Sequence, residues 1–225
     1  KLQQIDEMRR NGADVINLGI GSPDLPPSPE VTETLHQQAL NPKNHGYQSY
    51  IGIPELRAAF ARWYQQYFRV TLDPSGEILP LIGSKEGIMH ITMAFVNEGE
   101  EVLIPNPGYP AYESVARLVG ARVRYYDLTE SQGWLPDLGR LEAEGLEKVK
   151  LMWVNYPHMP TGTPASAALF GNLVAFARKH RILLCNDNPY SFILNTDTRS
   201  ILETEGSRDV ALELNSLSKS QNMAG

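Results

Sequence analysis

The chain contains a single cysteine, Cys185, among its 225 residues, so an internal disulfide is impossible. This cysteine usage suits a reducing compartment, and we expect a cytoplasmic protein. Acidic residues outnumber basic ones by 26 to 20, so the basic surface that nucleic acids attract is missing. Long apolar runs and an export-type leader are missing too, so we expect neither a membrane span nor secretion.

The remaining composition is that of an ordinary globular protein. Hydrophobic residues make up 42% of the chain, enough for a sizeable core, and the length suits one large domain or two small ones. No metal site is expected.

From Glu77 onward, short apolar runs alternate with helical patterns. Strands are predicted at 78–82, 101–104, 122–126, 150–155, 182–185 and 210–214, and helices at 85–96, 109–119, 135–144 and 164–180. This alternation predicts an α/β fold, a mostly parallel sheet with helices on both faces. Ligands of such sheets bind outside the carboxyl ends of the strands.

Three more helices are predicted before Glu77, within residues 1–14, 30–40 and 54–67. The last has apolar residues at i, i+3, i+4 and i+7, so its aromatic stripe is expected to be core. Pro54 suits its first helical position.

Lys219 follows the strand-like run 210–214, which ends in small polar residues. At the mouth of a buried site, where its charge is disfavoured, a lysine amine can form a Schiff base with a carbonyl cofactor. Most lysines after a strand are simply solvated, so this reading depends on other motifs.

Three upstream stretches supply that context. They are Gly83-Ser84-Lys85-Glu86-Gly87, Asn155-Tyr-Pro-His-Met-Pro-Thr-Gly162 and Asp187-Asn-Pro-Tyr190. In this order, and with Lys219 after them, they resemble the pyridoxal-phosphate (PLP) aminotransferases of class I and II, which share the fold-type-I architecture. The resemblance runs from about Asn17 to Gly225.

Gly83, Ser84 and Lys85 lie between a strand and a helix, where free backbone N–H groups and a partial positive charge attract anions. The resemblance implies that they bind the PLP phosphate, mainly through backbone N–H groups. It points to Ser216 and Ser218 as further cofactor-binding residues.

The resemblance also implies which residues contact the cofactor ring. Asp187 would keep the pyridine nitrogen protonated, Tyr190 would reach the 3-oxygen, and Tyr109 would stack on the ring. From the residues alone, an Asx-type turn at 187 and a packing aromatic at 109 remain open.

Two earlier positions complete the resemblance. Tyr47 would reach across a homodimer interface to the neighbour's PLP phosphate, and the backbone N–H of Gly21 would receive the substrate α-carboxylate. A half-buried loop tyrosine and a plain strand-to-turn transition are the open alternatives.

The chain departs from the family at Met159, where relatives carry an asparagine that donates to the 3-oxygen. A thioether cannot donate a hydrogen bond. That contact is therefore absent or replaced, and Tyr190 should matter more.

The resemblance implies an aminotransferase that moves an amino group between an amino acid and a 2-oxo acid. PLP would be held as an internal aldimine on Lys219, which would also transfer the α-proton, with Asp187 and Tyr190 tuning the ring. Alternatives on the same scaffold are a carbon–sulfur β-elimination lyase and a decarboxylase. A PLP-sensing regulatory domain is less favoured, because no basic DNA-binding module precedes Asn17.

We expect two parts in the chain. Residues 1–46 would form an N-terminal segment, and residues 47–225 the PLP-binding large domain, truncated after the Schiff-base lysine. The C-terminal part of the family fold is expected to be absent, and with it some of the residues that select the substrate side chain, the others being spread over loops.

Overall fold

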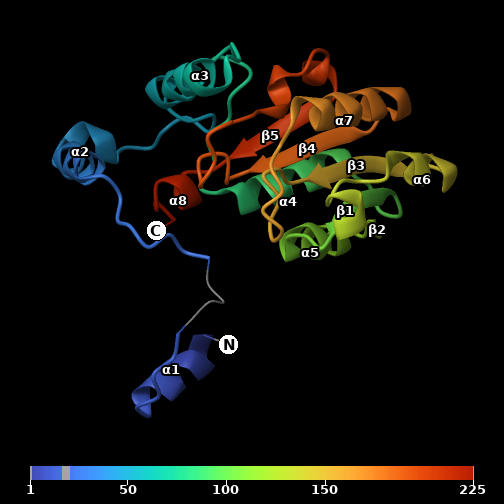
Figure 1. The fold of residues 1–225 in the computed structure, drawn as a ribbon. Coiled ribbons are helices and arrows are strands. Elements are labelled where there is room, and N and C mark those ends of the chain that lie inside the picture. Colours follow the sequence, from blue (N-terminus) through green and yellow to red (C-terminus); the bar gives the residue numbers. More distant parts are fainter. Residues whose placement is uncertain (1, 17–20, 225) are drawn as a thin grey trace.

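The computed structural model describes residues 2–16 and 21–224. In that part of the chain a five-stranded sheet with the order β2-β1-β3-β4-β5 forms the centre (Figure 1). Its strands are β1 (Glu101–Asn106), β2 (Arg122–Asp127), β3 (Val149–Val154), β4 (Leu183–Asn188) and β5 (Ala211–Asn215). Every neighbouring pair is parallel, so all carboxyl ends meet at one edge of the sheet.

Helices cover both faces of this sheet, which confirms the predicted fold class. One face packs against α6 (Leu138–Ala143) and α7 (Ala167–His180), and the other against α4 (Ser84–Phe95) and α5 (Pro110–Leu118). Successive side chains of a strand point to opposite faces. On β3, Met152 and Val154 accordingly join the α7 side, whereas Leu151 and Trp153 join the α4 side. A strand covered on both sides is expected to be apolar, and β3 is apolar from Leu151 to Val154, whereas Lys150 near its start is exposed.

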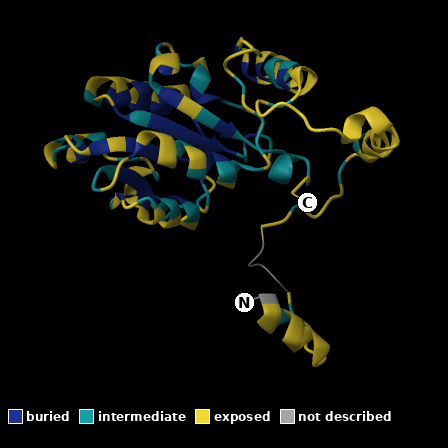
Figure 2. Ribbon diagram, turned by 180° about the vertical axis from the view of Figure 1, so that it is seen from behind, coloured by how far each residue is buried: buried dark blue, intermediate teal, exposed yellow. Residues whose placement is uncertain are grey.

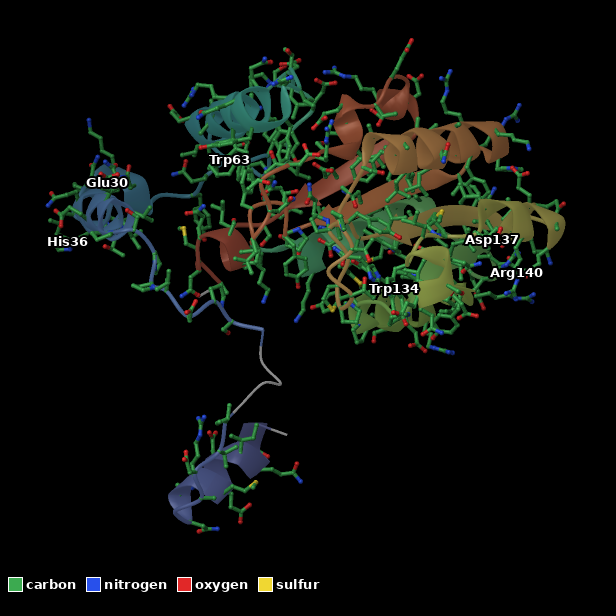
Figure 3. All side chains as sticks on the ribbon, in the orientation of Figure 1. Glu30, His36, Trp63, Trp134, Asp137 and Arg140 are labelled. Atoms are coloured by element: carbon green, nitrogen blue, oxygen red, sulfur yellow. The ribbon has the colours of Figure 1, made fainter. Side chains whose placement is uncertain are left out.

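The predicted helix at 54–67 is α3 (Pro54–Phe68), with its proline in the first turn. Tyr64 and Phe68 are buried together with Val70, as expected for a core stripe. Trp63, labelled in Figure 3, lies 5.2 Å from Phe192 between ring centroids in an edge-on contact.

The other elements are short or peripheral. They are α1 (Leu2–Arg10), α2 (Pro29–Ala39), α8 (Leu217–Ser220) and the 3₁₀ turns η1 (Pro42–His45), η2 (Glu130–Gln132), η3 (Ile201–Glu203) and η4 (Ser207–Asp209). Figure 2 shows α2 as an exposed helix, in contrast with the buried sheet, and its Glu30 and His36 lie apart from the sheet in Figure 3. The division at residue 46 stays a prediction.

Two helix ends are determined by residues next to them in the sequence. Gly120 has a φ of +78° just after α5, the left-handed conformation that closes a helix, as predicted. The helix predicted at 135–144 begins only at Leu138, because the Asp137 side chain accepts a 2.9 Å hydrogen bond from the Arg140 N–H and caps it (Figure 3).

The strand predicted at 78–82 is wrong. This segment has no strand conformation; together with β5 it lines a cleft of about 760 Å³. A strand needs a hydrogen-bonded neighbour, and across the cleft the segment has none in the described part of the chain. Two of its apolar side chains are exposed, Leu79 at 58% and Ile82 at 97%, whereas Ile78 and Leu81 are half-buried.

Among residues 2–16 and 21–224, no helix is both long and apolar enough to cross a bilayer. The same residues hold no cluster of three or more histidine, cysteine or acidic side chains arranged for a metal ion.

Candidate functional site

The candidate site lies at the carboxyl edge of the sheet, after β4 and β5. Asp187 is near the end of β4 and pairs in register with Leu214 of β5. Lys219 follows Leu214 by only five residues (219 − 214) and belongs to the short helix α8. Because the two strands are parallel neighbours, the topology brings these two sequence-predicted residues to the same edge.

Asp187 is buried, and its two carboxylate oxygens differ. Oδ2 accepts a 2.8 Å hydrogen bond from the Tyr112 hydroxyl. Oδ1 has no hydrogen-bond partner among the described residues. Burial raises the pKa of Asp187 to about 6, and the Tyr112 hydrogen bond opposes that rise. A buried acceptor left unpaired is costly, so this oxygen fits a ligand that brings its own N–H donor.

Asn155 holds the backbone of Asp187. Its Nδ2 donates to the Asp187 carbonyl oxygen at 2.5 Å, and its Oδ1 accepts from the Met159 N–H at 2.8 Å. No functional role was predicted for Asn155 beyond its place at the start of a motif. The available signal was a polar side chain directly after the buried apolar run 151–154, where such a side chain needs buried hydrogen-bond partners.

Tyr190 and Tyr109 lie close to Asp187. Burial raises the pKa of Tyr190, and the nearby Asp187 carboxylate raises it further. Tyr109 is the residue before α5, and its ring meets that of Tyr112 edge-on, 5.6 Å between centroids. The predicted ring-binding residues are therefore neighbours in space.

The predicted phosphate residues gather around the 760 Å³ cleft. Gly83 is the N-cap of α4 and Ser84 its first residue, and both line the cleft together with Ser216 and Ser218. Ser216 caps α8, accepting a 3.2 Å hydrogen bond from the Ser218 N–H through its hydroxyl oxygen. Lys85 is exposed, which agrees with a contribution through its backbone rather than its side chain.

The N-terminal segment reaches the lysine. Lys219 Nζ donates to the Gly21 carbonyl oxygen at 2.7 Å, and Asn222 Nδ2 donates to the Leu25 carbonyl oxygen at 2.7 Å. The predicted substrate-carboxylate residue therefore lies beside the predicted Schiff-base lysine. The rest of that predicted glycine-containing turn, residues 17–20, lies outside the described residues.

Tyr47 stands apart from the other predicted residues. Its side chain is fully exposed, and it does not line the cleft. A contact with a second subunit would require such exposure, but the exposure alone assigns no role.

Comparison with known proteins identifies the family. Residues 13–225 match the family model described as aminotransferase class I and II. The chain belongs to this family. Class I and II aminotransferases use PLP, so the resemblance inferred from the motifs is confirmed at the level of family, fold and cofactor.

Two relatives are enzymes named LL-diaminopimelate aminotransferase. The one from Dehalococcoides mccartyi is 44% identical over 99% of this chain and 58% of its own length. The one from Desulforudis audaxviator is 44% identical over 99% of this chain and 57% of its own length. The chain thus spans less than two thirds of these curated aminotransferases.

Two solved structures share this fold over the whole chain. Apo-BacF from Bacillus subtilis superimposes with a TM-score of 0.95 at 41% identity, covering 100% of this chain and 57% of the other. A probable N-succinyldiaminopimelate aminotransferase from Thermus thermophilus superimposes with a TM-score of 0.90 at 35% identity, covering 100% and 62%.

Proposed function

We propose that this chain is the cofactor-binding part of an aminotransferase that moves an amino group between an amino acid and a 2-oxo acid. The observation that carries the proposal is the unpaired Oδ1 of buried Asp187, at the same sheet edge as Lys219. Family membership adds an expectation of PLP chemistry, and these two residues are where that chemistry would be performed.

The residues present fit PLP. Asp187 Oδ1 would accept a hydrogen bond from the ring nitrogen, and the half-buried Tyr190 hydroxyl would face the 3-oxygen. Tyr109 would cover the ring face. The phosphate would lie at the start of α4, held by Gly83, Ser84, Lys85, Ser216 and Ser218.

When bound, PLP supplies an electron-withdrawing ring that stabilises negative charge at the substrate α-carbon. The protein's own work is to hold that ring and to move a proton. Asp187 would hold the ring nitrogen in its protonated form. The Lys219 amine would carry the cofactor covalently and then act as general base and acid for the α-proton. The Gly21 carbonyl, 2.7 Å from Nζ, fixes the position of that amine.

For the substrate, the relatives favour a first candidate. Enzymes named LL-diaminopimelate aminotransferase are 41–44% identical to this chain in several bacteria, which makes LL-diaminopimelate the amino donor to test first. The Gly21 N–H would receive the α-carboxylate of the donor. We also propose a cytoplasmic homodimer in which Tyr47 of each subunit reaches the neighbour's cofactor phosphate.

The experiment is an assay of the purified protein with PLP, 2-oxoglutarate and a panel of donors containing LL-diaminopimelate, aspartate and phenylalanine. Donor-dependent formation of glutamate is expected, and it should be lost in Lys219→Ala and kept in Lys179→Ala, an exposed lysine on α7. Release of ammonia and pyruvate from a donor without any 2-oxo acid acceptor would identify a lyase instead.

A further inference from the structure

The two oxygens of Asp187 are made unequal by a single side chain. The Tyr112 hydroxyl donates to Oδ2 at 2.8 Å, and Oδ1 has no partner among the described residues. If the carboxylate rotated freely, either oxygen could point toward a ligand. The hydrogen bond to Tyr112 fixes one orientation.

Tyr112 is itself rigidly placed. It is fully buried, and its ring stacks on Trp153 of β3 with centroids 5.0 Å apart and planes 4° apart. The ring of Tyr109 packs edge-on against it. A tyrosine has few rotatable bonds, so this packing determines where its hydroxyl lies. The Tyr112 hydroxyl that donates to Asp187 is thus held in place by packing against the sheet and by its position on α5.

The surroundings of Asp187 make that donor important. Burial raises the pKa of the carboxyl to about 6, and the Tyr112 hydrogen bond is the influence that lowers it among the described residues. The groups around Asp187 are Tyr112 from α5, Cys185 from the same strand and Tyr190 after it. Burial and the Asp187 charge raise the pKa of all three, so each stays protonated near neutral pH and Tyr112 remains a donor.

We propose that Tyr112 is a positioning residue for the aminotransferase reaction: it leaves Oδ1 of Asp187 free for the cofactor ring and stabilises the ionised carboxylate that the ring nitrogen needs. The proposal rests on the proposed function, since it assumes that PLP binds at Asp187. Tyr112 touches neither cofactor nor substrate in this scheme and acts only through Asp187.

The test is Tyr112→Phe, which keeps the stacked ring and removes the hydroxyl. PLP binding to the purified protein is measured by absorbance titration from pH 5 to 8. We expect the PLP dissociation constant to rise about tenfold at pH 7, the size of a lost hydrogen bond to a charged group. Binding of PLP weakens as pH falls through the pKa of Asp187, and this fall should move to higher pH in the variant.

The matched control is Tyr126→Phe. Tyr126 is a buried tyrosine of β2 whose hydroxyl donates to the Trp153 carbonyl oxygen at 2.6 Å, so its loss also removes a buried hydrogen bond near the stack. It makes no contact with the Asp187 carboxylate, and PLP affinity and its pH dependence should match the wild type. Thermal unfolding of the cofactor-free proteins reports the stability cost in both variants.

A double variant separates positioning from packing. In Asp187→Asn protein the charged partner is gone, so adding Tyr112→Phe should change the PLP dissociation constant less than about twofold. The inference about Tyr112 would be overturned by equal losses of PLP affinity in Tyr112→Phe and Tyr126→Phe, or by an unchanged pH profile of PLP binding in Tyr112→Phe. Either result would leave the proposed aminotransferase function unaffected. Wild-type protein that binds no PLP would overturn both.

Discussion

Lys219 Nζ donates a 2.7 Å hydrogen bond to the carbonyl oxygen of Gly21, a residue 198 positions earlier in the chain. With the second contact, from Asn222 to Leu25, it connects the N-terminal segment to α8 and the residues that follow this helix. The amine proposed to hold the cofactor and the backbone proposed to receive the substrate carboxylate are thereby held side by side.

Replacing Asp187 by asparagine should stabilise the cofactor-free protein above pH 7 while weakening PLP binding. The pKa of Asp187 is raised from 3.8 to about 6, so the folded protein holds this proton more tightly than the unfolded chain. Stability therefore falls as pH rises from about 4 to about 6, and the variant lacks that fall. At about 1.4 kcal/mol for each unit, the gain is about 1–3 kcal/mol. Urea unfolding at pH 4 and at pH 8 measures the difference in unfolding free energy between the variant and the wild type. A difference that favours the variant less at pH 8 than at pH 4 would contradict the prediction.

Removal of the Asn155 side chain should loosen Asp187. Asn155→Ala leaves the Asp187 carbonyl and the Met159 N–H without partners in a buried site, which costs about 2–4 kcal/mol of unfolding free energy. PLP affinity should fall as well. The control is Asn97→Ala, an exposed asparagine bonded to Glu100, which should stay within about 0.5 kcal/mol of wild type. Equal stability of the two variants would refute the role given to Asn155.

The carboxylate of Glu213 joins α3, β4 and η3 to β5. Oε1 accepts from Tyr64 and Ser200 at 3.0 and 2.8 Å, and Oε2 accepts from Asn186 and the Ile201 N–H at 2.9 and 3.0 Å. Glu213→Ala should cost about 3–5 kcal/mol, because four donors lose their acceptor.

The pH dependence of the Glu213 contribution has a definite sign. Burial raises the pKa of Glu213 above its ordinary value, so its contribution to stability declines as pH rises through the window between its unfolded and folded pKa. Glu213→Gln should lack this decline, which denaturant unfolding at several pH values would detect. If the unfolding free energies of Glu213→Gln and the wild type changed with pH in the same way, this prediction would be contradicted.

Met159→Asn should give the bound cofactor a new hydrogen-bond donor. If the side chain faces the cofactor's 3-oxygen, an amide there favours the deprotonated form of the bound cofactor. The midpoint of its pH-dependent absorbance change should then move to lower pH, by up to about one unit. Met93→Asn, at an exposed position of α4, is the control. An unmoved midpoint in Met159→Asn would show that this side chain does not face the 3-oxygen.

Much of this site is readable from sequence because it is built from strand ends. Asp187 lies at the end of one apolar run and Lys219 follows another, and parallel strands bring their ends to one edge of the sheet. This placement agrees with the shared site that the family resemblance implied. The helix start at Gly83 and Ser84 was also readable, from the helical pattern that follows, although the strand predicted before it does not form.

The residues that support the site were not readable in this way. Tyr112 lies in the apolar stripe of a helix, and the sequence does not reveal that its hydroxyl meets a carboxylate 75 positions later. The strand predicted at 78–82 failed for a related reason. Its apolar pattern is genuine, but strand formation depends on a hydrogen-bonded neighbour, which is a tertiary property.

The attachment of the cofactor to one amine is the most direct test of the proposed function. The purified protein is incubated with PLP, reduced with borohydride, digested, and its peptides are analysed by mass spectrometry. The predicted result is a reduced PLP adduct on the peptide containing Lys219 and on no other peptide. An adduct on Lys85, which lies beside the phosphate residues, or on any lysine other than Lys219, would contradict it.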